Sequence, residues 1–206
     1  MVIREYFQLL FPWLLVTFLA ASVSSWINPR QFQKGWQKLV VLVSSAFIAL
    51  LPVQGLSLAD YLLSLNPNFS IGSLALVVAL LWPKFIGQPL LSDRHLKIFC
   101  LWNVVVSLAL FSSYLGLLPY DLYALGYGFS PWFVVMALLT VVAVWCCYPL
   151  AIMGIACLAA FNLRLLPSPN LWDCITDGFL LLMSLGLLIM PWKRGERSLN
   201  AGRRKP

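Results

Sequence analysis

The sequence has few charged residues. Only 10% of its 206 residues are Asp, Glu, Lys or Arg, while 61% are hydrophobic. A soluble domain of average composition has about a quarter charged and about half apolar residues. The scarcity of charge therefore excludes a water-soluble globular domain and indicates an integral membrane protein.

Histidine and paired cysteines are scarce as well. His95 is the single histidine, and it lies in a charged segment, which excludes bis-His haem ligation and His-rich zinc sites. The five cysteines form no C-x-x-C motif, which argues against a thiol oxidoreductase. The sequence also lacks G-x-S-x-G, H-E-x-x-H and Walker motifs. We expect no metal and no cofactor, and enzymatic activity is left open without being favoured.

Long uncharged runs are what the sequence has instead. A helix needs about 20 apolar residues to cross a bilayer core of about 30 Å. The run after Asp121 is long enough for two spans, and Pro149 places the break at Cys147. The pattern predicts an all-α bundle of about seven spans: Tyr6–Ile27, Leu39–Leu58, Ile71–Ile86, Ile98–Tyr120, Pro131–Cys147, Pro149–Leu165 and Pro169–Trp192.

The distribution of the basic residues predicts the orientation of these spans. If the segment 28–38 is cytoplasmic, only Arg4 and Arg164 of the fourteen Lys and Arg residues lie outside. We therefore expect an external N-terminus, one helical domain over residues 1–192, and a basic cytoplasmic tail over 193–206. A bacterial inner membrane is the expected location. The membrane accounts for the net charge of +7, so we expect no nucleic-acid partner.

An external segment between the fourth and fifth spans combines an acid, aromatic rings and glycines. It contains Asp121, Tyr123 and Tyr127, with Gly126 and Gly128 beside them. Aromatic rings next to a carboxylate can bind a sugar or a lipid head group. The alternative is the ordinary aromatic belt of a membrane protein, which explains the rings but not the acid with two glycines.

Two further acids lie at the predicted start of the last span. Asp173 and Asp177 are four residues apart, which places them on one face of a continuous helix, where like charges repel. We expect Arg164, a helix N-terminus or a ligand to compensate them. Acids at membrane depth are functional candidates. The sequence thus predicts one external ligand site made of Asp121, Asp173, Asp177 and Arg164, covered by Tyr123, Tyr127 and Trp172.

A basic segment lies on the predicted cytoplasmic side. Arg30, Lys34 and Lys38 recur every four residues, and Phe32 and Trp36 have the same spacing. This pattern is typical of a short interfacial helix whose cations contact anionic lipids and whose aromatics enter the acyl boundary. The alternative is a connector whose cations only set the orientation.

Three function classes remain open from the sequence. The first is a non-catalytic component of the cell envelope that handles a lipid or a lipid-linked glycan at the outer leaflet, with membrane lipids and a larger membrane-protein complex as partners. The second is a small transporter or lipid flippase, which requires polar residues or broken helices near the middle of the membrane. The third is a membrane-embedded enzyme that uses the external carboxylates.

Overall fold

The structure is a computed structural model that describes residues 2–28, 32 and 34–190. Helices dominate this part of the chain, which confirms the predicted all-α class. Strands β1 and β2 form one small antiparallel hairpin. The elements are α1 Val2–Ile27, α3 Gly35–Leu50, β1 Pro52–Val53, β2 Leu56–Ser57, α4 Leu58–Leu65, α5 Ile71–Ile86, α6 Asp93–Tyr114, the 3-10 helix η1 Ala124–Gly126, α7 Pro131–Cys146, α8 Tyr148–Asn162, α9 Leu171–Ile175 and α10 Gly178–Ile189.

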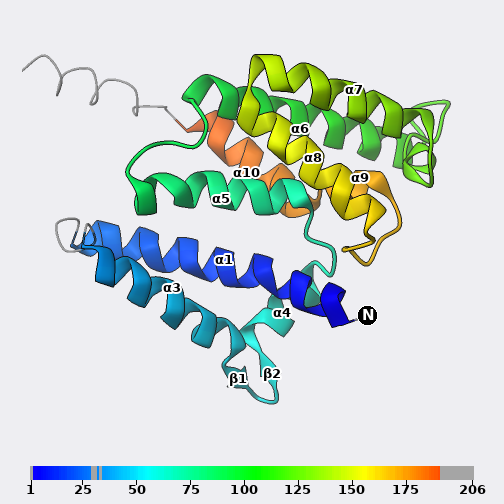
Figure 1. Cartoon of the computed structure of the whole chain (residues 1–206). Helices are drawn as coiled ribbons and strands as arrows, with labels where there is room; N and C mark the ends of the chain where they lie inside the picture. Colours follow the sequence, from blue (N-terminus) through cyan, green and yellow to red (C-terminus); the bar gives the residue numbers. More distant parts are fainter. Residues whose placement is uncertain (1, 29–31, 33, 191–206) are drawn as a thin grey trace, which may run out of the picture.

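The longer apolar helices run between the same two ends of the molecule in alternating directions (Figure 1). We call the end at which α1 begins the N-terminal end. Helix α4, the β1–β2 hairpin, α9 and the 115–130 segment lie toward that end, and the α5–α6 connection lies at the opposite end. By length and apolar composition, two of the described helices could cross a membrane, over Arg4–Ile27 and Asp93–Tyr114.

Helix α5 has the bounds that the sequence predicts and is the central helix of the fold. It contacts α1 on one side and α8, α9 and α10 on the other. Small or apolar residues, including Gly72, Ser73 and Leu76, are buried along it. Ser70 begins the helix, and its hydroxyl accepts a hydrogen bond from the N–H of Ser73. Gly87 ends it with a φ of 87°, a left-handed conformation that glycine adopts without strain.

The break between α7 and α8 lies where proline predicts it. Cys147 separates the two helices with an extended φ of −160°, and Pro149 lies in the first turn of α8. The two helices then pack antiparallel, and Gly154 of α8 contacts the side chain of Thr140 so closely that a Cβ atom there would collide with it. The long uncharged run therefore folds as an α-helical hairpin.

The predicted span Leu39–Leu58 is wrong at both ends. Helix α3 begins at Gly35 and ends at Leu50, because the residue before Pro52 is driven out of the helical region. A hairpin follows whose turn residues Gln54 and Gly55 both have positive φ, at 53° and 89°. This is the backbone of a two-residue turn that suits the twist of paired strands.

Two other spans also differ from the prediction. Helix α6 begins at Asp93 and ends at Tyr114, and Gly116, with a φ of 72°, turns the chain into an irregular segment instead of a helix as far as Tyr120. The predicted span Pro169–Trp192 is broken. Thr176 is extended between α9 and α10, so Asp173 and Asp177 do not share one helix face.

The predicted basic stripe is not one helix face in the described residues. Lys34 is extended and precedes α3, whereas Lys38 lies within α3 and donates a hydrogen bond of 2.6 Å to the carbonyl of Phe85. Phe32 is buried, and its ring lies edge-on to that of Phe85. Trp36 is exposed, as expected for an interfacial ring. Arg30 and the predicted tail over 193–206 lie outside the described residues.

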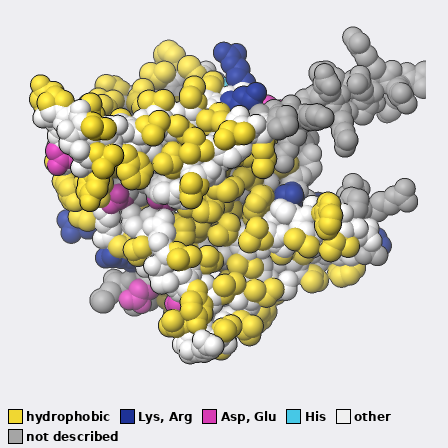
Figure 2. Space-filling model, turned by 180° about the vertical axis from the view of Figure 1, so that it is seen from behind, with side chains coloured by type: hydrophobic (Ala, Val, Ile, Leu, Met, Phe, Trp, Pro, Cys, Tyr) yellow, Lys and Arg dark blue, Asp and Glu magenta, His cyan; other side chains and the backbone are white. Residues whose placement is uncertain are grey.

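Apolar side chains cover the outside of the helices as well as the core. Figure 2 shows hydrophobic side chains over most of one face, with most of the visible acids toward one end. Phe47 on α3 is 73% exposed and Leu182 on α10 is 71% exposed. Soluble monomers rarely expose contiguous apolar surface of this extent.

Candidate functional site

An acidic cavity opens at the N-terminal end between α6, the 115–123 segment and the α9–α10 break. Its volume is about 660 Å³, within the usual range for a ligand pocket. We call it the acidic cavity, and it is lined by Ser107, Leu110, Phe111, Ser113, Tyr114, Leu118, Pro119, Tyr120, Asp121, Tyr123, Asp173, Thr176, Asp177 and Gly178. It thus has an apolar wall on α6 and three carboxylates around its polar part.

Asp177 joins the N-termini of two helices. Its Oδ1 accepts a hydrogen bond of 2.8 Å from the N–H of Leu180, which caps α10. Its Oδ2 accepts bonds of 2.6 Å from the N–H of Ser70 and 2.7 Å from the hydroxyl of Ser73, at the start of α5. The positive ends of both helix dipoles therefore stabilise this carboxylate.

Asp173 pairs with the hydroxyl of Tyr123. The phenol donates a hydrogen bond of 2.7 Å to Oδ2 of Asp173. Burial of Tyr123 and this bond raise the pKa of the phenol well above its usual value. The phenol therefore remains protonated at any physiological pH, so it acts as a fixed donor that orients the carboxylate toward the cavity.

Asp121 lies at the exposed rim of the acidic cavity. Its Oδ1 accepts a hydrogen bond of 3.1 Å from the N–H of Ala124, at the start of η1. Ser113 at the end of α6 holds the same segment, since its hydroxyl donates to the carbonyl of Tyr120 and accepts from the N–H of Leu122, both at 2.8 Å. These bonds fix the rim of the cavity to α6.

Asn170 and Trp172 connect α9 to the 122–123 segment, and Asn170 is not among the site residues that the sequence predicts. The Asn170 amide donates to the carbonyl of Tyr123, and the indole N–H of Trp172 donates to the carbonyl of Leu122, both at 2.9 Å. Both side chains are buried, and Gly126 lies directly against them, where a Cβ atom would collide. The asparagine after Ser168-Pro169 was the available signal, because asparagine is a preferred helix N-cap and Asn170 caps α9.

A buried polar network closes the floor of the acidic cavity. The hydroxyl of Thr176 donates to Oδ1 of Asn103 at 2.6 Å and lies 2.9 Å from the hydroxyl of Ser107. The Asn103 amide donates in turn to Ser184 on α10 at 3.2 Å. The network thus links α6 to the residue at which the last helix is broken.

Three predicted site residues lie outside the acidic cavity. Arg164 is exposed at the end of α8 with a φ of 51°, and it does not line the cavity; Asp177 is compensated by helix N-termini instead. Tyr127 is exposed and lies edge-on to Tyr123 at 5.8 Å between ring centroids. Trp172 is buried beneath the site against Trp132. The acidic cavity therefore brings together Asp121, Tyr123, Asp173 and Asp177 of the predicted site, but not Arg164, Tyr127 and Trp172.

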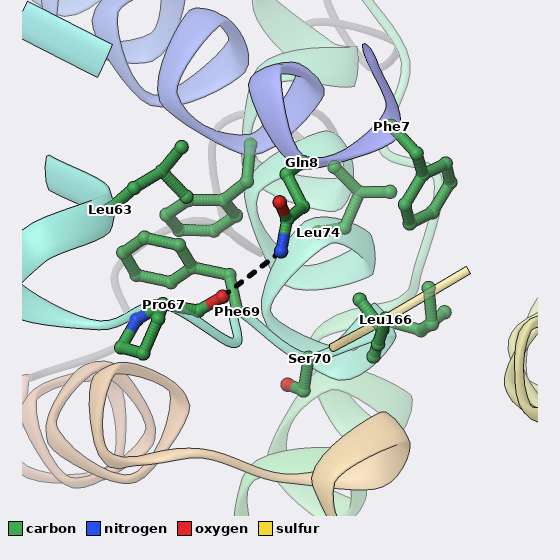
Figure 3. A pocket seen from close by; sticks show the side chains of 10 residues that line it. Phe7, Gln8, Leu63, Pro67, Phe69, Ser70, Leu74 and Leu166 are labelled. Carbon is green, nitrogen blue, oxygen red and sulfur yellow. Dashed lines mark hydrogen bonds between the residues drawn. The ribbon is translucent and has the colours of Figure 1, made fainter. Parts of the chain in front are cut away.

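A second cavity at the N-terminal end is too small for a ligand. It lies between α1, α5 and the 66–69 segment (Figure 3), and its volume is about 10 Å³, about the space of one water molecule. Gln8 crosses it and donates a hydrogen bond of 3.2 Å to the carbonyl of Pro67. The packing there is structural.

The described residues contain no group of three or more His, Cys, Asp or Glu that could hold a metal ion. Comparisons with protein-family models, curated proteins and solved structures give no match for this chain. A proposal about function therefore depends on the geometry of the acidic cavity.

Proposed function

We propose that the chain is a non-catalytic membrane component that holds a lipid in the acidic cavity at the outer leaflet. The observation that carries the proposal is the two-part lining of the cavity. Leu110, Phe111 and Leu118 offer an apolar wall, while Asp121 and Asp173 offer polar groups a short distance away. A lipid has the same division between acyl chain and head group.

In this proposal the longer apolar helices span the membrane seven times, with the N-terminal end outside and the opposite end in the cytoplasm. The exposed apolar side chains of α3 and α10 support it, because lipid would cover them. The cations Lys38, Lys84 and Arg94 belong to the start of α3, the end of α5 and the start of α6, and these helix ends lie at the opposite end (Figure 1), as expected for a cytoplasmic face. We also propose that the protein lies in a bacterial inner membrane and belongs to a larger membrane-protein complex.

The roles of the three acids favour binding over catalysis. Asp177 caps α10 and accepts bonds from Ser70 and Ser73, Asp121 accepts a bond from the N–H of Ala124, and Asp173 accepts one from Tyr123. A general acid or base must be free to exchange its proton with the substrate. The acids instead shape the polar part of the cavity.

The break between α9 and α10 supports a lipid flippase as a second candidate. Helix α10 has 12 residues, so at about 1.5 Å per residue it covers about 18 Å of a bilayer core of about 30 Å. Thr176 and Asp177 then lie inside the membrane, beside Asn103. Broken helices and polar groups at that depth occur at transport sites. Measuring the movement of a fluorescent lipid across reconstituted vesicles distinguishes transport from binding alone.

A bulky side chain at Gly178 tests the lipid-binding proposal. Gly178 lines the acidic cavity, and a Cβ atom there meets nothing within 4 Å, so Gly178→Trp fills the cavity from open space. Gly186→Trp is the matched control, because Gly186 lies in the same helix with equal room and does not line the cavity. We expect Gly178→Trp to reduce bound lipid by about tenfold, the equivalent of about 1.4 kcal/mol, in native mass spectrometry of the purified protein. Equal lipid retention by the two variants would contradict the proposal.

A further inference from the structure

The polar part of the acidic cavity contains side-chain donors that are already engaged. The Tyr123 hydroxyl donates to Asp173, and the Ser113 hydroxyl donates to the carbonyl of Tyr120. Ser107 and Thr176 are bonded to each other in the network of the floor. A head group that enters between these side chains therefore meets few free donors.

Carboxylate oxygens remain available in the same part of the cavity. Within the described residues, Oδ2 of Asp121 and Oδ1 of Asp173 receive no hydrogen bond, since each acid uses only its other oxygen. An ionised carboxylate can accept about four hydrogen bonds. Asp177 adds a third negative charge, and no Lys or Arg of the part of the chain that the structure describes lines the cavity. The cavity thus offers acceptors and negative charge.

From this complementarity we infer that the occupant is a membrane lipid whose head group carries a primary ammonium group, as in phosphatidylethanolamine. The inference rests on the proposed function of lipid binding. An ammonium group has three donors and one positive charge, which match the open oxygens of Asp121 and Asp173. The apolar wall of Leu110 and Phe111 receives the acyl chain.

The rim of the cavity suits the phosphate of such a lipid. Tyr114 and Tyr120 line the cavity and are exposed, at 86% and 74%. Their phenol hydroxyls can donate to phosphate oxygens at the water interface, where tyrosine rings are usual in membrane proteins. The ammonium group then faces the carboxylates of Asp121 and Asp173, and the phosphate faces the phenols of Tyr114 and Tyr120, so both charges of the zwitterion have partners.

The test compares three lipids with the same acyl chains on the purified full-length protein. Phosphatidylethanolamine has ammonium donors, phosphatidylcholine has the same net charge without N–H donors, and phosphatidylglycerol has a net negative charge. We expect the apparent Kd for phosphatidylethanolamine to be about tenfold lower than for phosphatidylcholine, the value of one charge-assisted hydrogen bond, with phosphatidylglycerol the weakest. Native mass spectrometry of the titrated protein measures all three.

Isosteric variants test whether the preference for phosphatidylethanolamine depends on the charges of Asp121 and Asp173. In Asp121→Asn with Asp173→Asn, the bonds to Ala124 and Tyr123 can still form on the remaining oxygen, but the charge is lost. The ratio of the Kd for phosphatidylcholine to the Kd for phosphatidylethanolamine should then fall from about ten to about one or two. Asp60→Asn removes an acid of α4 that does not line the cavity and should leave the preference unchanged.

The outcomes separate this inference from the proposed function. If the parent chain binds the three lipids equally and Gly178→Trp weakens that binding, the head-group inference is overturned and the proposed lipid binding stands. A preference that survives the double Asn variant would overturn the head-group inference as well. Binding that Gly178→Trp does not change, for any of the lipids, would overturn both the inference and the proposed function.

Discussion

Replacing Asp177 with alanine should destabilise the protein by about 3 kcal/mol, which for a chain of this size is a fall of about 6–12 °C in the unfolding midpoint. The variant removes three hydrogen bonds at once, from Ser70, Ser73 and Leu180. Helix α10 loses its N-cap, which is worth about 1 kcal/mol or more, and the start of α5 loses the two bonds that hold it to α10. The N–H groups left behind are partly buried, where water replaces the carboxylate poorly.

The control for this result is Asp121→Ala, which removes an exposed acid that accepts one hydrogen bond, from the N–H of Ala124. Its midpoint should fall by less than about 3 °C, since exposed substitutions usually change stability by little. Asp177→Asn keeps one carbonyl oxygen and should lie between the two. The midpoints are measured by intrinsic fluorescence in detergent at one scan rate, because membrane proteins often unfold irreversibly. Equal shifts for Asp177→Ala and Asp121→Ala would show that Asp177 does not join α5 to α10.

The variant Gly72→Ala should destabilise the protein by about 3 kcal/mol, at the upper end of the usual cost of overpacking. A Cβ atom at Gly72 collides with the backbone carbonyl of Ile175 and lies 2.6 Å from Leu180. A backbone carbonyl cannot rotate away like a flexible side chain, so α5 must move from the α9–α10 break. That movement also pulls Ser70 and Ser73 from Asp177.

Gly186→Ala provides a control of opposite sign. Gly186 lies within α10, and a Cβ atom there meets nothing within 4 Å. Alanine in a helix interior is favoured over glycine by about 0.5–1 kcal/mol, so this variant should be slightly more stable than the parent chain. The losses from Gly72→Ala and Asp177→Ala should also be less than additive, because they act on one junction. A midpoint for Gly72→Ala at or above the parental value would contradict the packing of α5 against α9 and α10.

Local signals in the sequence were sufficient for several helix boundaries. Ser70 and Gly87 flank α5, and Pro149 places the break after α7, because caps and prolines act within a few residues of where they occur. The same kind of signal was present at Asp177-Gly178, where an acid N-cap begins α10. The prediction of one continuous last span depended on the length of the apolar run and did not use the N-cap signal at Asp177.

The candidate site could be predicted only in part. Asp121, Tyr123, Asp173 and Asp177 were identified as neighbours because they lie at the ends of helices that meet at one end of the molecule. The burial of Asn170 and Trp172 depends on Gly126, more than forty residues earlier, which leaves room for both. Two of the partners of Asp177, Ser70 and Ser73, lie at the start of α5, more than a hundred residues away. Such distant contacts have no signature in local spacing, so the sequence left Arg164, a helix N-terminus and a ligand as alternatives, and the structure shows helix N-termini at Asp177.

The proposed orientation is tested by measuring on which side of the membrane each end of the molecule lies. Cys146→Ser removes an exposed cysteine and leaves Cys100, Cys147, Cys157 and Cys174, which are buried. In this background, Ala124→Cys introduces an exposed thiol beside the acidic cavity, and Gln88→Cys introduces one at the opposite end. A membrane-impermeant maleimide is then added to intact cells and to permeabilised cells. We expect the cysteine at position 124 to react in intact cells and the one at position 88 to react only after permeabilisation. Labelling of both in intact cells, or the reverse pattern, would contradict the proposed orientation.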